Sequence, residues 1–440
     1  MNLRVLIFAD QEPVHGVIPA LRLLYDISMV ERHIRNFAFL GVTNITVVVP
    51  VNENGEEIRK QCDGFDTTWF APAYPIHIVD TDAIASVLPV DSDHPLLMID
   101  AHHLYDQRAL DAIMQARPGT MLVDVDATPG EPTSEPCHLA VVAAAVSVRI
   151  TEIWQGSAAL WDHLVALRRN GEIRRLNIRD IDSYVINLRR FITPFWLPVE
   201  TERDERVGER HLIDAAQKGT LDLPARYLHP LFENWMTKQV ARFPVISPNV
   251  ITTVTNIIAF VATGLMVLDG VGPGLFLAAL VGIMDGVDGK LARTTVRCTK
   301  FGDRYEHILD NIYELSWYWA LGWAFSGGAL GHFPLIMSGL MTLFYILDRA
   351  FTGGFKHFKQ IELFDYAPID RLFRQIGSRR NINILMMIIG TAIRLPYEAF
   401  LVMVAWMMFT AVFHGGRVAW IALLSSRSDR VAETVGGAGS

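Results

Sequence analysis

The sequence predicts a soluble α/β domain at the N-terminus, followed by an all-α membrane domain of about six transmembrane helices. Strand-like and helix-like segments alternate up to about Phe243, with many charges among them. Beyond Phe243 long apolar runs dominate, as they do in membrane domains. Hydrophobic residues make up 51% of the 440 residues and the mean hydropathy is +0.25, which is unusual for a wholly soluble protein.

The first domain opens with a strand, a helix and a second strand. Residues 3–8 and 45–50 are predicted to be buried parallel strands, and they flank a helix over residues 29–40 that Gly41 closes. This order is typical of a doubly wound α/β sheet. Further strands are expected at residues 76–79, 96–99, 120–123 and 139–148.

Charge and cysteine content say little about partners but indicate a compartment. The net charge is −8, but its sign varies along the chain, and no nucleic-acid partner is expected. Cys62, Cys137 and Cys298 are scattered without pairing or metal-ligand spacing, which favours a reducing compartment and no disulfide framework. Residues 1–10 resemble a first strand without a basic segment, so no signal peptide is expected.

The second domain contains six apolar segments. We expect membrane spans at about residues 250–268, 274–289, 305–326, 333–350, 382–395 and 397–413. Pro248 suits the start of the first of these helices. Several segments approach the ~20 residues that a helix needs to cross a bilayer, and the fifth is short.

Basic residues predict the orientation of these spans. They gather in the loops after the second and fourth spans, at Lys290, Arg293, Arg297, Lys300, Arg304, Lys356, Lys359, Arg371, Arg374, Arg379 and Arg380. The loops on the opposite side hold one basic residue among them, so the basic side is expected to be cytoplasmic. A multi-pass protein of the cell membrane is therefore predicted, with both termini and the first domain in the cytoplasm.

Four acidic residues lie at the edge of these apolar runs. Asp285 and Asp288 are three positions apart, and Glu306 and Asp310 are four apart, so each pair shares one helix face. Two such helices packed antiparallel would aim four carboxylates at one small volume. Carboxylates at this depth are costly unless they are paired or bind a cation. A set of oxygen ligands alone suits Mg²⁺ or Mn²⁺ better than Zn²⁺.

The spacing D-x-x-D-G-x-x-A-R-x₈-G-x₃-(D/E)-x₃-D resembles the signature of the CDP-alcohol phosphotransferase family. Seven positions match this signature, namely Asp285, Asp288, Gly289, Ala292, Arg293, Gly302 and Asp310. Glu306 stands where the family has a third aspartate, which keeps the charge but reaches one methylene further. The resemblance implies a two-metal site held by Asp285, Asp288, Glu306 and Asp310, with Asp310 as the base that takes the proton of an acceptor hydroxyl.

The same resemblance implies a CDP-alcohol donor, which transfers its phospho-alcohol to a hydroxyl acceptor and leaves as CMP. The residues expected to bind substrates are Gly289, Lys290, Ala292, Arg293 and Gly302, together with Asn249 and Thr252 of a Pro-Asn-x-x-Thr element. Arg379 and Arg380 form the best cluster for a phosphorylated acceptor such as inositol phosphate. A lipid hydroxyl is the other acceptor considered.

The first domain, to about Trp196, looks like the nucleotidyltransferase-like fold. Residues 34–49 and 196–204 carry this likeness, but the catalytic parts are missing. Residues 9–16 have acids in place of the usual glycines and arginine, and Ala20 follows Pro19 where a lysine is usual. A catalytically degenerate domain is therefore expected. The alternative is a rebuilt active site, for which the candidates are Asp100, His102, His103 and Glu200.

The linker between the two domains is predicted to be amphipathic, with helices at residues 205–217 and 230–240. Residues 218–226 are similar to the linker of bifunctional inositol-phosphate cytidylyltransferase and di-myo-inositol-phosphate-phosphate synthase proteins. These helices would lie in the lipid headgroup region or pack under the first domain. The expected domains are residues 1–204, a juxtamembrane linker at 205–247, the membrane domain at 248–425 and a flexible tail at 426–440.

Three functions remain open from the sequence. A phosphotransferase that uses a CDP-inositol-like donor is favoured, because the fused first domain resembles enzymes that activate polyols. The alternatives are a CDP-diacylglycerol-dependent phosphatidyltransferase of phospholipid synthesis and a non-catalytic membrane scaffold. Small residues in the second span permit close packing or homodimer contacts, at Gly274, Ala278, Ala279 and Gly282.

Overall fold

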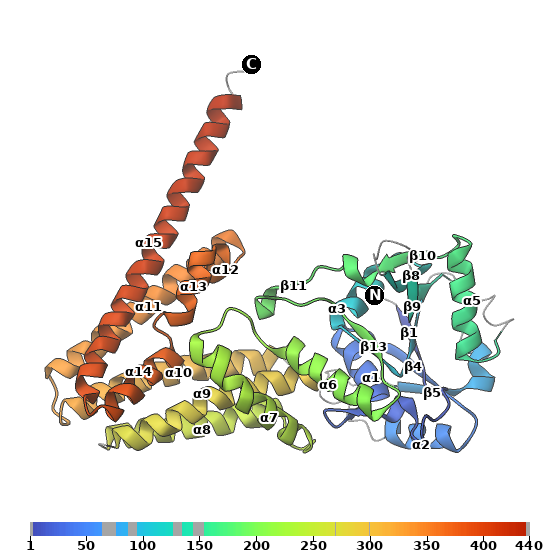
Figure 1. Cartoon of the computed structure of the whole chain (residues 1–440), viewed down its shortest axis with the longest axis horizontal. Coiled ribbons are helices and arrows are strands. Elements are labelled where there is room, and N and C mark those ends of the chain that lie inside the picture. Colours follow the sequence, from blue (N-terminus) through green and yellow to red (C-terminus); the bar gives the residue numbers. More distant parts are fainter. Residues whose placement is uncertain are drawn as a thin grey trace. The chain divides into compact units, whose positions relative to one another are not determined.

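The computed structural model describes residues 3–63, 76–86, 95–125, 134–143, 154–268, 270–298 and 300–436 (Figure 1). The chain divides into two compact units. Unit 1 comprises Met1–Gln217 with Ala241–Pro244 and Ala292–Arg297, and unit 2 comprises Lys218–Val240, Val245–Leu291 and Cys298–Ser440.

Unit 1 is built on a seven-stranded sheet in the order β10-β8-β9-β6-β1-β4-β5. The strands are β1 (Arg4–Phe8), β4 (Asn44–Val49), β5 (Ile76–Asp80), β6 (Leu96–Asp100), β8 (Thr120–Val125), β9 (Ser134–Val142) and β10 (Arg174–Asn177). β1 runs parallel to β4 and β6, with Val5 opposite Ile45 and Leu97. The predicted α/β class is confirmed.

Strand β9 departs from a purely parallel, doubly wound sheet. It runs antiparallel to both β6 and β8, so the sheet is mixed. The pairing with β8 is irregular between Met121 and Val123. The strand expected at residues 139–148 is present up to Val142, and residues 144–148 lie outside the described part of the chain.

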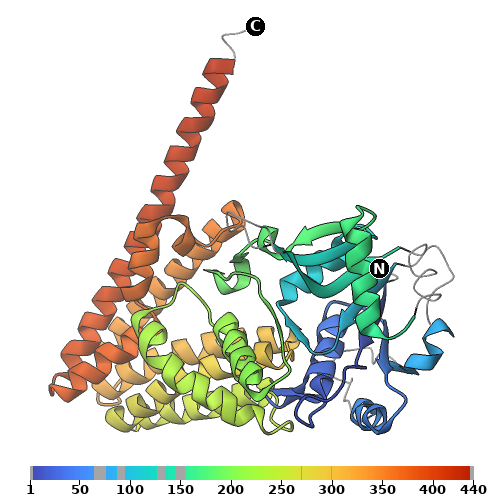
Figure 2. The same ribbon diagram turned by 45° about the vertical axis from the view of Figure 1, so that its right-hand side comes forward.

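Helices cover both faces of this sheet (Figures 1 and 2). They are α1 (Met29–Phe39), α2 (Glu53–Asp63), α3 (Gln107–Gln115) and α5 (Ser157–Arg169). Because side chains alternate along a strand, Val5 and Ile7 pack in the cluster with α1 and α3, whereas Leu6 and Phe8 pack with α5. The hydroxyl of Ser28 accepts a hydrogen bond from the Glu31 amide and caps α1.

Short elements complete unit 1. They are η1 (Pro19–Leu21), β2 (Leu23–Leu24), β3 (Ile27–Ser28), η3 (Thr81–Ser86), β7 (His103–Tyr105), η4 (Ile178–Asp180), β11 (Tyr184–Val185), η5 (Ile186–Leu188), β12 (Arg190–Phe191) and β13 (Trp196–Pro198). α6 (Glu202–Ala216) begins with a capping box between Thr201 and Asp204. It belongs to unit 1, and the expected headgroup location of residues 205–217 stays a prediction.

Unit 2 is helical. Its elements are η6 (Pro224–Leu228), α7 (His229–Ala241), α8 (Pro248–Val267), α9 (Val271–Thr294), α10 (Lys300–Phe325), α11 (Phe333–Lys359), α12 (Leu363–Tyr366), α13 (Pro368–Ile376), α14 (Arg380–Ala392) and α15 (Pro396–Gly436). In Figures 1 and 2 the C-terminal part of α15 extends beyond the other helices of the unit. Flexibility of residues 426–440 stays a prediction, because α15 continues to Gly436 and residues 437–440 lie outside the described part.

A helix lies at each of the six predicted spans, but the count of six spans is not confirmed. Four helices of the described chain are long and apolar enough to cross a membrane, namely α8, α9, α11 and residues Pro396–Leu424 of α15. α10 carries Glu306, Asp310 and Glu314, and α14 is only 13 residues long. The predicted all-α, multi-helix domain is nevertheless what the structure shows.

The membrane helices pack through a shared apolar core that includes Met266, Leu275, Trp317, Met341 and Phe400. Their outward faces are also apolar. Ile257, Phe276 and Val412 are more than half exposed, which suits contact with lipid.

The small residues of the second span are used inside unit 2. A Cβ on Gly274 would lie 2.8 Å from the main-chain oxygen of Ala262, and Ala278 is fully buried in the core. A Cβ on Gly282 would likewise lie 2.9 Å from Oδ1 of Asn381 on α14. These positions therefore bring helices of the same chain together, and dimer contacts stay a prediction.

Candidate active site

Three carboxylates from two helices converge in unit 2. Asp285 lies on α9, and Glu306 and Asp310 lie one turn apart on α10. One oxygen from each of the three lies within 4.8 Å of the others, and all three side chains are half-buried. The structure thus brings together three of the four acids that the sequence predicted to meet.

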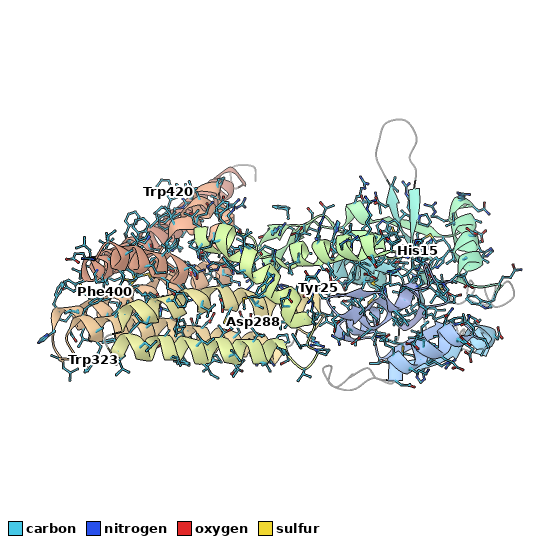
Figure 3. The ribbon with its side chains drawn as sticks, turned by 60° about the horizontal axis from the view of Figure 1, so that its bottom comes forward. His15, Tyr25, Asp288, Trp323, Phe400 and Trp420 are labelled. Atoms are coloured by element: carbon cyan, nitrogen blue, oxygen red, sulfur yellow. The ribbon has the colours of Figure 1, made fainter. Side chains whose placement is uncertain are left out.

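Asp288, the fourth acid, lies one turn further along α9 (Figure 3). It is only 3% exposed. Its Oδ2 accepts a hydrogen bond from Thr252 Oγ1 on α8 at 2.5 Å, and its Oδ1 accepts one from the Gly289 amide at 2.5 Å. Thr252, which was expected to contact substrate, therefore fixes a carboxylate of the acidic motif.

Arg380 joins the carboxylates of the two helices. It is the first residue of α14. Its guanidinium forms an ion pair with Asp285 and a hydrogen bond from Nη1 to Asp310 Oδ1 at 3.0 Å. One positive charge thus offsets part of the mutual repulsion among three carboxylates. Arg379 is directed elsewhere, with its guanidinium 4.9 Å from the centre of the Phe364 ring.

Lys290 is held by α7 in the structure. It is 2% exposed, and its Nζ lies 2.8 Å from Glu233 Oε2 and 2.6 Å from Asn234 Oδ1. Glu233 approaches α9 so closely that a Cβ on Gly286 would overlap its carboxylate. The expected contact of Lys290 with a diphosphate stays a prediction.

The remaining predicted residues occupy the same helices. Gly289 and Ala292 are half-buried on α9, Gly302 lies one turn before Glu306 on α10, and Asn249 is the second residue of α8. Arg293 Nε donates a hydrogen bond to the main-chain oxygen of Ala216 at 2.9 Å.

Sequence reasoning missed a further acid, Glu314, one turn beyond Asp310 on α10. Tyr318 and Tyr345 donate hydrogen bonds to its two oxygens at 2.9 and 3.0 Å, and Arg349 lies 3.4 Å away. The sequence contained a signal for this acid, because Glu314 follows Asp310 by four residues within an apolar run and so shares its helix face. Its hydrogen bonds link α10 to α11.

The group of three carboxylates fits a hard divalent cation. Its ligand atoms are all oxygens, from Asp285, Glu306 and Asp310, and magnesium and manganese prefer oxygen ligands. The half-buried position of these three side chains reduces competition from bulk water for the ion.

The residues considered for a rebuilt site in unit 1 lie near the ends of β6 and β7. Asp100 ends β6 and His103 begins β7. His102 Nε2 lies 3.6 Å from Glu200 Oε1. Burial lowers the pKa of His102, and it lowers that of His103 well below its ordinary value, so both rings are neutral at physiological pH.

Asp10 lies in the stretch of residues 9–16, where the catalytic loop was expected to be degenerate. Its Oδ2 accepts a hydrogen bond from the Ser157 amide at 3.0 Å, at the first residue of α5. Burial raises the pKa of this carboxyl group. The Asp10 carboxylate therefore satisfies a main-chain amide at the N-terminus of α5.

Residues 245–426 match the model of the CDP-alcohol phosphatidyltransferase family. The match covers the C-terminal part of the chain. The matched residues include Thr252, Arg380 and the four acids of the motif. Glu233, on α7, precedes the matched residues.

Two curated relatives share the name "Bifunctional IPC transferase and DIPP synthase". The protein from Thermococcus kodakarensis is 28% identical over 165 residues, which cover 36% of this chain and 37% of the relative. The protein from Aquifex aeolicus is 26% identical over 129 residues, which cover 29% of each chain. The chain thus spans little more than a third of the length of the first of these relatives.

Among solved structures, the chain is similar to the inositol-1-phosphate CTP transferase from T. maritima. The sequence identity is 12% and the TM-score is 0.34, and the match covers 48% of this chain and 96% of that chain.

Proposed function

We propose that the helical part of the chain is a divalent-metal-dependent phosphotransferase that acts on a CDP-alcohol. The observation that carries this proposal is the convergence of Asp285, Glu306 and Asp310 from two helices, each with an oxygen within 4.8 Å of the others. Acids at this depth are costly to keep without a cation or a reaction to serve.

The metal would be Mg²⁺ or Mn²⁺, held as a two-ion site by Asp285, Glu306 and Asp310 with Asp288 beside them. Bound ions of this kind neutralise charge on a diphosphate and help to orient the groups that react. The hydrogen bonds to Asp288 from Thr252 and Gly289 fix the rotamer of that carboxylate before any substrate binds.

The proposed reaction is a displacement at phosphorus. The acceptor hydroxyl oxygen forms a bond to the β-phosphorus of the CDP-alcohol, and the bond from that phosphorus to the CMP oxygen breaks. A carboxylate oxygen of Asp310 takes the hydroxyl proton. Arg380, which contacts Asp310 and Asp285, lies where it can neutralise the phosphate charge as Asp310 becomes protonated.

We infer a soluble head-group donor of the CDP-inositol type. The support is the likeness of the chain to relatives named "Bifunctional IPC transferase and DIPP synthase" and the α/β first domain. The acceptor would be an inositol phosphate or a lipid hydroxyl. The first domain would be catalytically degenerate, since Asp10 caps α5 in place of a phosphate-binding glycine. The active site would face the cytoplasm, and a homodimer is expected.

The test is CMP release by the full-length protein reconstituted in lipid vesicles. The donors are CDP-inositol and CDP-diacylglycerol, each with inositol phosphate or a lipid hydroxyl as acceptor, and with Mg²⁺ or Mn²⁺. We expect release with CDP-inositol, and Asp310→Asn should lower it by about 100-fold or more because a general base is lost.

The matched control is Glu398→Gln, which changes an exposed acid in the first turn of α15. It should release CMP at the wild-type rate. Release with CDP-diacylglycerol alone would identify a phosphatidyltransferase of phospholipid synthesis. No release from any donor by the folded, metal-supplied protein would support the non-catalytic scaffold instead.

A further inference from the structure

A second group of possible metal ligands lies in unit 1, and it differs in chemistry from the acidic site of unit 2. Asp100, His103 and His138 each offer one ligand atom, and these atoms lie within 4.8 Å of one another. Two imidazoles and one carboxylate form a mixed nitrogen and oxygen set. Such a set suits Zn²⁺ and similar transition metals better than Mg²⁺.

The fold brings these residues together from three strands. Asp100 ends β6, His103 begins β7 and His138 lies within β9. β9 pairs with β6 from Leu139 onward, so the position before Leu139 comes beside the end of β6. The three residues therefore meet only because β9 inserts antiparallel next to β6.

The backbone at His138 is unusual and directs the side chain. His138 has a φ of +49°, in the left-handed region that residues with a side chain rarely adopt. Its carbonyl accepts a hydrogen bond from the Tyr105 hydroxyl at 3.0 Å, which helps to hold this conformation. Its ring stacks on Trp161 with an interplanar angle of 6°. Strain of this kind is often kept at sites that have a function.

The carboxylate already pairs with one of the rings. Asp100 Oδ2 lies 2.8 Å from His138 Nδ1, and Asp100 Oδ1 accepts a hydrogen bond from Gln11 Nε2 at 3.3 Å. Asp100 is 2% exposed, so it is an acid that needs a positive partner. A cation shared with His138 would supply one.

His103 is a second observation that points to a ligand at this site. It is 4% exposed, and its Nδ1 has no hydrogen-bond partner among the residues that the structure describes. Its ring centre lies 4.8 Å from that of His138. A buried nitrogen without a hydrogen-bond partner costs free energy, and a cation bound at that nitrogen would remove the cost.

We propose that Asp100, His103 and His138 bind a transition-metal ion of the Zn²⁺ class in the α/β domain. The side chain of His138 is 30% exposed while that of Asp100 is 3% exposed, so His138 offers a path by which the ion enters from solvent. A fourth position would be left for water or for an external ligand.

This ligand set differs from the candidates that the sequence offered for a rebuilt active site, because it includes His138 and leaves out His102 and Glu200. Glu200 lies beside His102 rather than among the three ligand atoms. Glu200→Gln is therefore the most informative control, because it removes the acid that a nucleotide-type magnesium site would need. His77→Gln, at an exposed position in β5, controls for surface histidines.

The experiment is Co²⁺ binding to the full-length protein in detergent, followed by visible absorption. Excess Mg²⁺ is added to occupy the oxygen-only site in unit 2. The wild type should bind one Co²⁺ with the strong visible bands of a low-coordinate site that contains nitrogen, and Zn²⁺ should displace it. His138→Gln and Asp100→Asn should weaken binding at least about tenfold and remove the bands.

His138→Gln is the main variant because its side chain is partly exposed, and circular dichroism would verify that it remains folded. Glu200→Gln and His77→Gln should bind like the wild type. The proposal is overturned if the wild type gives no bands under excess Mg²⁺, or if folded His138→Gln binds Co²⁺ unchanged. Loss of binding in Glu200→Gln alone would point to the nucleotide-type metal pair instead.

Discussion

Arg380 Nη1 lies 3.0 Å from Asp310 Oδ1, and the same guanidinium contacts Asp285. The residue expected to bind a phosphorylated acceptor is thus in direct contact with two of the motif acids, one of which is the expected base. Substrate, metal and base would therefore share one electrostatic environment. A change in the charge of any one of them would alter the pKa values and the binding of the others.

Arg380→Gln should lower both the stability of the metal-free protein and its activity. The change leaves Asp285 and Asp310 half-buried without a cation, which costs about 1–3 kcal/mol. Thermal unfolding in a chelator should show a lower midpoint, and Mg²⁺ should restore much of the difference. Arg380→Lys keeps the charge and should lose less stability. An unchanged unfolding midpoint for Arg380→Gln in the chelator would show that the ion pairs of Arg380 contribute nothing to the stability of the metal-free protein.

Glu306→Asp should retain CMP release and change its metal preference. The shorter side chain restores the family's aspartate and withdraws the carboxylate by one methylene, so the ligand distances on α10 change. Because Mg²⁺ demands more nearly ideal octahedral geometry than larger ions, the ratio of rates with Mg²⁺ and Mn²⁺ should shift several-fold. Glu306→Gln removes the charge and should reduce release by at least about tenfold. Equal Mg²⁺ to Mn²⁺ ratios in wild type and Glu306→Asp would contradict this expectation.

Glu233 and Lys290 should behave as a coupled buried pair. Their side chains are 6% and 2% exposed, with Nζ and Oε2 2.8 Å apart. Glu233→Gln or Lys290→Met alone removes one member of this buried ion pair and should cost about 3–5 kcal/mol of unfolding free energy. The double variant should cost clearly less than the sum of the two. Chemical denaturation of all four proteins checks this, and additive costs would rule out direct coupling.

Cys62 should resist alkylation in the folded protein. Burial raises the pKa of its thiol from the ordinary 9.0 to about 12, so only about one molecule in ten thousand carries the thiolate at pH 8. The half-exposed Cys298 should react first with iodoacetamide, as peptide mass spectrometry would reveal. Because the thiolate is favoured only in the unfolded state, this group reduces stability as the pH rises from 9 to 12. Equal labelling of Cys62 and Cys298 under native conditions would refute the prediction.

The sequence determined the two classes of structure and most of the elements. Strand β1, helix α1 and strand β4 lie within two residues of their predicted bounds. Hydrophobic periodicity and capping residues such as Ser28 predict these bounds well, because both act locally along the chain. The spacing of Asp285, Asp288, Glu306 and Asp310 likewise indicated a shared site, since helical periodicity fixes which residues share a face.

Only the tertiary structure decided which side chains meet. The contact of Arg380 with Asp310 joins residues 70 positions apart, and the pair of Lys290 with Glu233 depends on the absence of a side chain at Gly286. His138 joins Asp100 and His103 only because β9 runs antiparallel beside β6. Periodicity carries no information on such long-range pairings, which depend on how whole elements pack and on which buried charges must find partners.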